Sequence, residues 1–370
     1  MRVLLLSAYA AQSHRYWQLG LRQMFPHWQW VELELPARHF SWRVRGNPLF
    51  WSVSEREVLE SGFQLLVATS MVDLATLRGL VPALANVPSL LYFHENQFEF
   101  PQDRQQHSLL EAQMVSIYSA MAADRLAFNS AYNRDSFLSG CSQLFARLPD
   151  FVPERLVDAM EEKTEVLPVP LLPVVEAQAS AWRPEEKSRA LRILWNARFE
   201  HDKGGEGLHR ILKGLEPSGL HYQLAVTGQQ FRNSPAVFSA IQRDFVHRLV
   251  QFGYMDSAAD YHALQAGADI ILSTALHEFQ GLAVMQAVRA GCMPLVPDRL
   301  AYREMYPEHC RYQSCPDNLQ QEADSAITLL LALAARPSVP IDMSAYSIEQ
   351  LRPRYLRLLQ SLQDSQPQPS

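Results

Sequence analysis

A carboxylate and a glycine at the start of a predicted helix have the chemistry to bind a phosphorylated sugar. The run from Glu278 to Gln286 follows a short apolar segment, 270–274, and leads into another, 293–297. This order predicts strand, loop, helix and strand, with Gly281 at the helix start, where free N–H groups and the helix dipole favour a phosphate. Since a carboxylate would repel that phosphate, Glu278 is expected to bind hydroxyls of the group attached to it. A helix start with an incidental glutamate is the plainer alternative.

A charged loop in the same half carries two cations. Arg198 and Lys203 enclose residues 199–202 after a predicted strand at 192–197. Breaking a sugar–phosphate bond leaves negative charge on a nucleoside diphosphate, which two fixed cations can stabilise without a metal. A solvated charged loop is the alternative, but the presence of both motifs favours function. We therefore expect neither a metal nor a cofactor. No Walker loop or GxGxxG is present, which disfavours a P-loop ATPase or a dinucleotide oxidoreductase.

Polar side chains follow a predicted strand in the first half. His94, Glu95 and Asn96 come directly after the apolar run 89–93. Ligands of parallel sheets collect at the carboxyl ends of strands, so we expect a binding site here. A single histidine at a strand end is more often structural, but a cluster of four polar residues favours binding.

Residues 38–45, expected to form a loop, interleave three arginines with two aromatic side chains. Trp42, Arg43 and Arg45 lie in this segment. Such a combination can contact phosphates and stack an unpaired base, although a surface loop with a buried tryptophan is an equal alternative. The net charge of −6 argues against nonspecific binding to nucleic acid, so an RNA partner would need a local patch.

Two series of strands and helices must position these residues. Apolar runs alternate with amphipathic stretches, which predicts an α/β fold with parallel sheets. The predicted strands of the first half are 3–8, 30–35, 64–69, 89–94 and 125–129, with helices at 16–25, 109–123 and 131–140. The predicted strands of the second half are 192–197, 222–227, 249–254, 270–274 and 293–297.

A change in composition along the chain predicts the domain boundaries. Four prolines between 168 and 184 mark a linker at 173–190, which separates a first domain, 1–172, from a second, 191–345. An amphipathic helix at 346–362 follows, and the polar tail 363–370 is expected to be disordered.

Composition limits the class of protein. The 370 residues allow two domains, and 48% hydrophobic with 19% charged residues is typical of a globular chain. No apolar run reaches the roughly 18 residues of a membrane span. The four cysteines form no CxxC pair, which disfavours disulfides or structural zinc. We expect a cytoplasmic protein without stable membrane association.

The two second-half motifs resemble the donor signature of retaining glycosyltransferases with the GT-B fold, in which two Rossmann-like domains carry parallel sheets that face each other across a cleft. The resemblance implies that Glu278 binds the donor sugar and that Arg198 and Lys203 bind its diphosphate, beside the helix start at Gly281. Gln286 departs from the pattern, which has a second glutamate there for the ribose hydroxyls.

First-half motifs narrow the resemblance. Ser13–His14, Trp42–Arg45, Phe93–Gln97 and Phe128–Asn133 are similar to those of the tRNA-queuosine α-mannosyltransferases. That family implies transfer of mannose from GDP-mannose to queuosine in the anticodon of tRNA-Asp, and a final helix that returns to the first domain. Catalysis is then expected from Glu278 and from His94, which would position the sugar. The residues expected to bind the acceptor tRNA are Ser13, His14, Trp42, Arg43, Arg45, Glu95, Asn96 and Asn129.

Two other functions are compatible with the sequence. A GT-B enzyme of polysaccharide or glycolipid synthesis would usually carry a basic or amphipathic helix for docking to a membrane. A glycosyltransferase-like protein could also bind a nucleotide sugar or RNA without transfer, for which Gln286 is the one hint.

Overall fold

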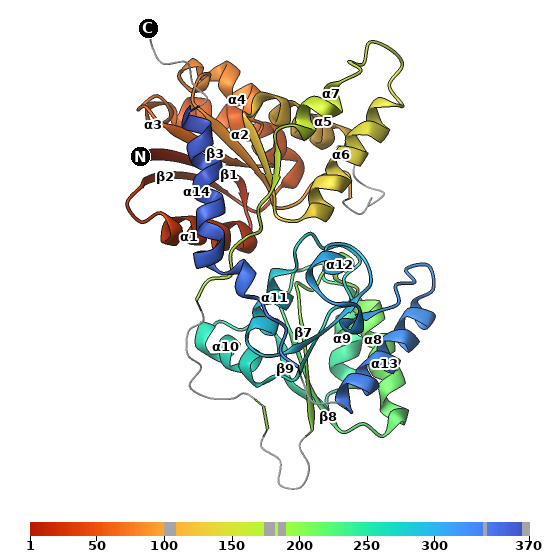
Figure 1. Cartoon of the computed structure of the whole chain (residues 1–370). Coiled ribbons are helices and arrows are strands. Elements are labelled where there is room, and N and C mark those ends of the chain that lie inside the picture. Colours follow the sequence, from red (N-terminus) through yellow and green to blue (C-terminus); the bar gives the residue numbers. More distant parts are fainter. Residues whose placement is uncertain (100–108, 174–181, 184–189, 336–338, 365–370) are drawn as a thin grey trace. The chain divides into compact units, whose positions relative to one another are not determined.

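The computed structural model describes residues 1–99, 109–173, 182–183, 190–335 and 339–364. The chain divides into two units, Met1–Leu172 with Tyr346–Ser370, and Pro173–Ala345 (Figure 1). Most of the predicted linker, 173–190, and residues 365–370 of the predicted tail lie outside the described residues.

The first unit is built on a parallel sheet of six strands in the order β2-β1-β3-β4-β5-β6. All five strands predicted for this half are confirmed. The sixth, β6, has only three half-buried residues and no periodicity to announce it. The strands are β1 (Arg2–Ala10), β2 (Gln29–Pro36), β3 (Leu65–Thr69), β4 (Ser89–Phe93), β5 (Arg125–Phe128) and β6 (Thr164–Val166).

Helices surround this sheet, and one of them replaces the loop predicted at 38–45. Helix α2 covers that segment although Pro48 lies inside it. Proline cannot donate to the carbonyl four residues before it; here the Asn47 side chain donates to that carbonyl, of Val44, over 2.9 Å, and to the carbonyl of Arg43 over 2.7 Å. Because Pro48 masks the pattern, the sequence did not predict this helix. The helices are α1 (Gln12–Met24), α2 (Phe40–Ser54), α3 (Arg56–Leu59), α4 (Leu74–Leu80), η1 (Pro82–Leu84), α5 (Leu109–Ala122), α6 (Ala131–Phe145), α7 (Leu156–Glu161) and α14 (Ile348–Asp364).

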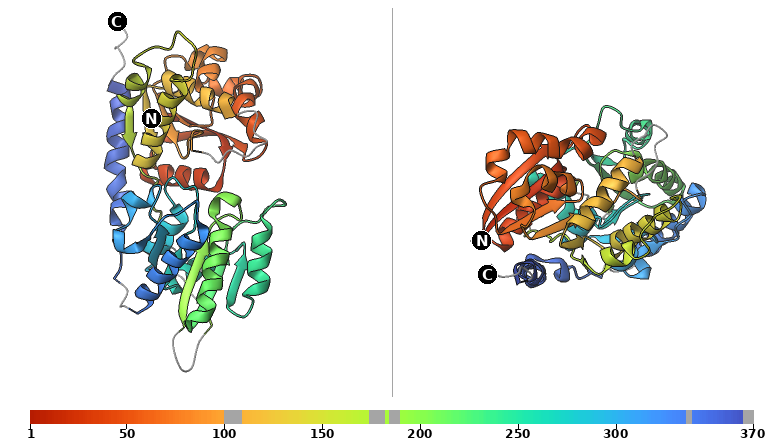
Figure 2. Two further views of the ribbon diagram at one scale, coloured as in Figure 1. Left: turned by 90° about the vertical axis from the view of Figure 1, so that its right-hand side faces the viewer. Right: turned by 90° about the horizontal axis from the view of Figure 1, so that it is seen from above.

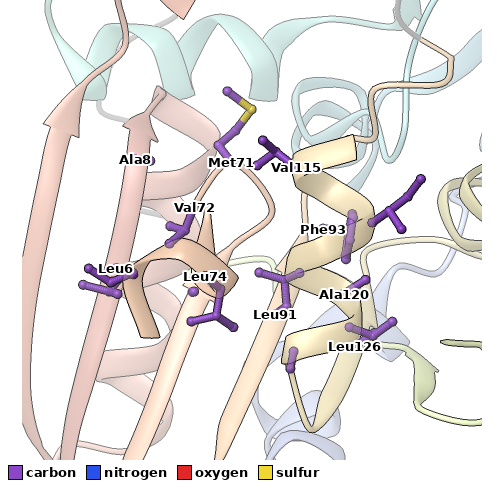
Figure 3. Packing of buried hydrophobic residues seen from close by; sticks show 14 of the residues in the cluster. Leu6, Ala8, Met71, Val72, Leu74, Leu91, Phe93, Val115, Ala120 and Leu126 are labelled. Atoms are coloured by element: carbon purple, nitrogen blue, oxygen red, sulfur yellow. The ribbon is translucent and has the colours of Figure 1, made fainter. Parts of the chain in front are cut away.

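One hydrophobic cluster of the first unit lies on one face of its sheet. Side chains alternate between the faces of a strand, so Leu6, Leu91 and Phe93 share a face and pack against Leu74 of α4 and Val115 of α5 (Figure 3). Burying such side chains stabilises the fold by roughly 1.5–3 kcal/mol each. Tyr92, between two core residues, points to the opposite face.

Helix α14 completes that opposite face. The Tyr355 hydroxyl accepts a hydrogen bond from Trp17 Nε1 over 3.0 Å and donates to the carbonyl of Pro168 over 3.0 Å. The Trp17 ring in turn stacks on Tyr92, with centroids 4.2 Å apart. All three side chains are buried. The last helix of the chain, blue in Figure 2, is therefore part of the first unit, where it contacts α1 (Figure 1).

The second unit repeats the plan with a parallel sheet in the order β12-β11-β10-β7-β8-β9. The five strands predicted here are confirmed, and β12 is an addition of two residues. The strands are β7 (Leu191–Asn196), β8 (Tyr222–Thr227), β9 (Leu249–Gly253), β10 (Ile270–Leu272), β11 (Met293–Pro297) and β12 (Arg311–Tyr312). The helices are η2 (His201–Lys203), α8 (Gly205–Leu215), η3 (Glu216–Ser218), α9 (Ala236–Asp244), α10 (Ala258–Gly267), α11 (Leu282–Arg289), α12 (Tyr302–Met305), η4 (Glu308–Cys310), α13 (Leu319–Ala334) and η5 (Ser344–Tyr346).

The predicted α/β class with two parallel sheets is confirmed. Over the described part of the chain, every helix is too short or too polar to cross a membrane.

Replacing Tyr355 with Phe tests the contribution of α14. The change keeps the ring but leaves the buried Trp17 N–H without its acceptor, which costs about 1–3 kcal/mol. We expect the melting temperature of the first unit to fall by roughly 2–4 °C for each kcal/mol lost, measured by near-UV circular dichroism. Tyr118→Phe, on an exposed side chain of α5, is the control and should melt like the wild type. Equal melting of both variants would contradict this role of Tyr355.

Candidate functional site

Glu278 folds back on the loop that precedes helix α11. Its carboxylate accepts hydrogen bonds from the backbone N–H groups of Phe279, over 3.2 Å, and Gly281. Gly281 is the N-cap of α11, as predicted, and has a φ of +74°, a conformation that favours glycine. The Glu278 side chain remains 24% exposed, so it can still meet a ligand.

Lys203 ties the two sequence motifs together. Its Nζ lies 3.3 Å from the Glu278 carboxylate and 3.2 Å from that of Asp202, and it donates to the carbonyl of His277 over 2.9 Å. Burial alone would lower the pKa of Lys203, but the two carboxylates outweigh it and raise the pKa. Burial likewise favours a higher pKa for Glu278, but Lys203 and the Gly281 N–H bring it below its usual value. Both groups therefore stay charged.

Arg198 is the looser of the two predicted cations. Its guanidinium pairs with Glu200 over 3.0 Å and its side chain is 47% exposed. Its positive charge opposes part of the rise that Glu278 and Asp202 cause in the pKa of Lys203. The structure thus brings Arg198, Lys203 and Glu278 into one electrostatic neighbourhood, although Arg198 makes its ion pair outside the Lys203–Glu278 pair.

A small pocket gathers these groups at one edge of the second sheet. Lys203, Glu278 and Gly281 line it together with Asn196, at the end of β7, and Ser273, just after β10. Strands β7 and β10 are parallel neighbours, so their carboxyl ends meet at this edge. The pocket can hold a small polar group against one carboxylate, one ammonium and one helix start.

Gln286 belongs to a hydrogen-bond chain that the sequence did not suggest. The Tyr261 hydroxyl accepts from Asn196 Nδ2 over 2.6 Å and from Gln265 Nε2 over 3.0 Å. Its own proton is then directed toward Gln286 Oε1, 3.5 Å away. This contact orients the Gln286 amide so that its NH₂ group is left to donate elsewhere. Tyr261 carries no motif, so only the fold could identify it.

The loop of Lys203 is fixed to β10 by a close backbone approach. Gly204 has a φ of +71°, and a Cβ at this position would lie 1.9 Å from the carbonyl oxygen of Thr274. The Thr274 hydroxyl donates to the carbonyl of Lys203 over 3.0 Å and accepts from Trp195 Nε1 over 3.0 Å. Only glycine allows this approach, which sets the position of Lys203.

In the first unit, two histidines stack at the end of β4. The rings of His14 and His94 lie 4.1 Å apart at 19°, and His14 Nε2 is 3.3 Å from the Glu95 carboxylate. Burial first, and His14 second, hold the pKa of His94 well below its usual range. Three predicted site residues are thus brought together, and His94 is a neutral hydrogen-bonding group.

Several buried polar atoms of the first unit have no hydrogen-bond partner. Within the described part of the chain, His14 Nδ1 and His94 Nε2 are buried without a hydrogen-bond partner, as are the side-chain atoms Ser7 Oγ, Gln18 Nε2 and Thr69 Oγ1. Ser7 and Thr69 lie on the neighbouring strands β1 and β3, and Gln18 lies one turn after His14 on α1. Buried polar atoms without partners are costly and rare, so they mark this layer as a place for a ligand or ordered water. Sequence reasoning missed Gln18.

Asn96 and Asn129, predicted to bind the acceptor, both have hydrogen-bond partners within the first unit. Asn96 donates to Asn133 Oδ1 and Ser136 Oγ, each over 2.9 Å, and Asn129 donates to the carbonyl of His94 over 2.8 Å. Both side chains are buried. Because these amides are used within the fold, they position the turn that carries His94.

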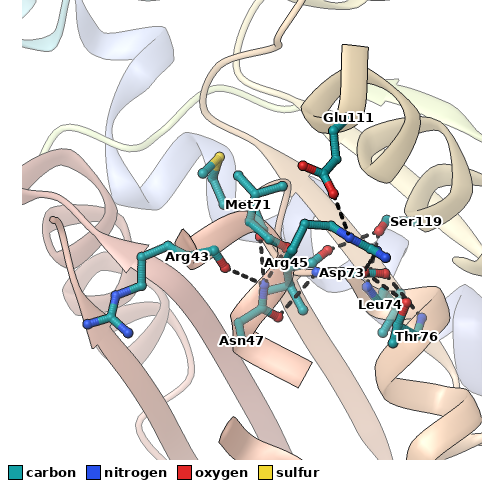
Figure 4. Close-up of polar contacts among 11 residues, drawn as sticks. Arg43, Arg45, Asn47, Met71, Asp73, Leu74, Thr76, Glu111 and Ser119 are labelled. Carbon is teal, nitrogen blue, oxygen red and sulfur yellow. Dashed lines mark hydrogen bonds and ion pairs between the residues drawn. The ribbon is translucent and has the colours of Figure 1, made fainter. Parts of the chain in front are cut away.

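The predicted acceptor residues of 40–45 lie on α2 and differ from one another. Arg45, predicted to bind the acceptor, forms ion pairs with Asp73 over 2.5 Å and with Glu111 over 3.2 Å inside the first unit (Figure 4). Arg43 donates through Nε to the carbonyl of Pro36 over 3.3 Å. Trp42 is 58% exposed, so the alternative of a buried tryptophan is wrong.

Ser13 is exposed in the first turn of α1. Among the residues that the structure describes, no three His, Cys, Asp or Glu side chains gather as metal ligands would.

Sequence comparison connects both halves to one family. A family model described as "tRNA-queuosine alpha-mannosyltransferase N-terminal" matches residues 2–171. The tRNA-queuosine alpha-mannosyltransferase of Drosophila melanogaster is 30% identical over 317 residues, which cover 84% of this chain and 83% of that protein.

Comparison with solved structures addresses the fold. Sucrose-phosphate synthase from Thermosynechococcus elongatus matches with a TM-score of 0.70 at 13% identity, over 99% of this chain and 100% of that one. Anabaena HepE in complex with UDP matches with a TM-score of 0.61 at 13% identity, over 98% and 100% of the two chains. At these identities the likeness shows the fold alone, and it confirms the predicted GT-B class.

Replacing Gly204 with Ala should disturb the site more than replacing Gly219. Both glycines lie in the second unit at nearly the same φ, +71° and +75°, but nothing lies within 4 Å of a Cβ at Gly219. Gly219→Ala then costs only the left-handed backbone, about 1–2 kcal/mol. Gly204→Ala must in addition move the Thr274 backbone, so it should melt several degrees lower in differential scanning fluorimetry. Equal melting temperatures would refute the close approach.

Proposed function

The chain belongs to the tRNA-queuosine alpha-mannosyltransferase family and is a glycosyltransferase. From this premise we propose that it moves mannose from GDP-mannose onto queuosine in the anticodon of tRNA-Asp, with retention of configuration at the anomeric carbon of the sugar. The observation that carries the proposal is the Lys203–Glu278 pair at the start of α11, within a chain related to its Drosophila counterpart over 84% of its length.

The donor is assigned to the second unit. Glu278, kept ionised by Lys203, accepts hydrogen bonds from the mannose hydroxyls, while the diphosphate meets the helix start at Gly281 and the two cations. Arg198 can exchange its partner Glu200 for a phosphate at little cost in free energy, because an exposed ion pair stabilises a protein by only about 0–1 kcal/mol. Lys203 stays in place as a fixed charge.

Ribose recognition is assigned to Gln286. With its Oε1 directed to Tyr261, the amide offers N–H donors to the ribose oxygens. A glutamine lacks the charge assistance of a carboxylate, so the nucleotide should be bound less tightly than a glutamate would allow.

The reaction depends more on stabilising the negative charge of the leaving diphosphate than on a catalytic base. Interactions that strengthen in the transition state accelerate the reaction, and the two cations face the charge that develops there. We propose that they make a divalent metal unnecessary. His94, neutral and buried, suits the positioning of a sugar hydroxyl and not proton abstraction.

The acceptor is assigned to the first unit. Trp42, Arg43, Ser13, His14 and Glu95 are the candidates that remain after Arg45, Asn96 and Asn129 are given internal roles. A tRNA acceptor fits a cytoplasmic enzyme.

Transfer to matched tRNAs tests the function. Purified protein, GDP-[¹⁴C]mannose and tRNA-Asp carrying queuosine should give labelled tRNA, while the same tRNA carrying guanosine should not, because it lacks the cyclopentenediol hydroxyls. Magnesium removal by EDTA should leave transfer to a prefolded tRNA intact. Equal labelling of both tRNAs would overturn queuosine as the acceptor; labelling of neither, with several nucleotide sugars, would favour a binding protein.

Variants of the second unit test the donor assignment. Arg198→Ala removes a charge-assisted contact of roughly 1.5–3 kcal/mol, so kcat/KM should fall at least tenfold. Glu278→Gln should reduce transfer severely but leave the affinity for GDP, measured by calorimetry, nearly unchanged. Arg243→Ala, which breaks a similar exposed pair with Asp244, is the control and should act as wild type. Loss of GDP binding in Glu278→Gln would make Glu278 a nucleotide ligand or a structural cap.

A further inference from the structure

The indole of Trp42 packs against Gly46, one turn further along helix α2. A Cβ on Gly46 would lie 2.5–2.8 Å from Cε2, Cδ2 and Cζ2 of the Trp42 indole. These three atoms follow one another in the six-membered ring, so the missing Cβ would press on the ring face. The indole therefore lies flat on the backbone at Gly46, and any other residue there would push it away.

Much of the Trp42 side chain remains exposed to solvent. Trp42 is 58% exposed even though Gly46 covers one side of it. A large aromatic ring that is held flat and left wet on one face costs free energy in water. A planar partner would recover that cost without rearranging the protein.

The helix turn under Trp42 is firmly anchored. Asn47 donates to the carbonyls of Arg43, Val44 and, over 3.3 Å, Met71 (Figure 4). Arg45 adds its ion pairs to Asp73 and Glu111. The ring is thus presented on a rigid element, which lowers the entropic cost of binding a partner.

The immediate surroundings favour a negatively charged partner. Arg38 and His39 are exposed just before α2, and the Arg43 side chain extends away from the anchoring cluster around Asn47 (Figure 4). The nearby carboxylates Asp73 and Glu111 are engaged by Arg45. An aromatic face flanked by cations is the arrangement that binds unpaired bases together with their phosphates.

We propose that Trp42, held flat by Gly46, is a stacking platform for an unpaired base of the RNA acceptor, with Arg43 and Arg38 beside its phosphates. The inference rests on the proposed function and assigns Gly46 a part in it: the glycine sets the plane of the ring, and so the plane of the base.

Steady-state transfer to queuosine-containing tRNA measures the platform. Stacking on one aromatic ring contributes roughly 5- to 150-fold in affinity, so Trp42→Ala should raise the KM for tRNA by about that factor and leave the KM for the donor unchanged. Gly46→Ala should do likewise by tilting the indole, whereas Trp42→Phe should recover most of the loss. Gly79→Ala, in helix α4 with open space around its Cβ position, is the matched control.

A spectroscopic measurement separates stacking from general damage. Quenching of Trp42 fluorescence by a single-stranded RNA loop, taken as the difference between wild type and Trp42→Phe, should be lost in Gly46→Ala. A fully paired RNA duplex should not quench the Trp42 fluorescence of the wild type or of Gly46→Ala, because its bases are already stacked.

Other outcomes would overturn the inference. Unchanged KM for tRNA in Trp42→Ala, while the wild type is active, would reject the platform and leave the proposed function standing. If Val53→Ala, an exposed apolar position farther along α2, raised KM as much as Trp42→Ala, the helix would dock an apolar partner surface instead. Absence of transfer to any tRNA by the wild type would reject the proposed function itself.

Discussion

The ion pair between Lys203 and Glu278 is the constraint on which the second unit depends. The ammonium is only 11% exposed, so both charges lie in surroundings where an unpaired ion is costly. Removing one partner of such a pair typically costs about 3–5 kcal/mol. The pair joins the loop after β7 to the loop after β10, and Asp202 and the N–H groups of Phe279 and Gly281 complete its hydrogen bonds. Any ligand of this pocket meets a carboxylate whose charge and direction are already set.

In the first unit, the predicted site residue His94 is a buried group that carries no charge. Buried His94 stays unprotonated because burial and the adjacent His14 both oppose a positive charge. Its ring is held from several sides, by stacking on His14 and by the edge of Trp17. One unit therefore offers fixed charges and the other offers neutral donors and acceptors, a division that fits a reaction in which a diphosphate leaves and a hydroxyl arrives.

The sequence predicted the parts of the molecule that follow from periodicity and failed where contacts between distant residues decide. Predicted strand ends indicated the sheet edges at which Glu278, Lys203 and His94 lie, because parallel strands deliver their carboxyl ends to one edge. Nothing in the local pattern could show that Asp73 would neutralise Arg45, or that Asn133 would occupy Asn96. Helix α2 was not predicted because Pro48 argues against a helix. The amide of one side chain, Asn47, replaces the hydrogen bond that the proline cannot donate. Tyr261 could not be predicted for a different reason. Its role depends on hydrogen bonds with three side-chain amides that lie on separate elements.

The place of α14 in the first unit bears on how the protein is made. The chain emerges from the ribosome with residues 1–172 first and the second unit next, and domains generally fold as they appear. The first unit, however, lacks the acceptor for the Trp17 indole until Tyr355 has been synthesised, some 180 residues later. The half of the molecule that is translated first is thus completed only after the second unit has been translated, when Tyr355 can accept the hydrogen bond of Trp17.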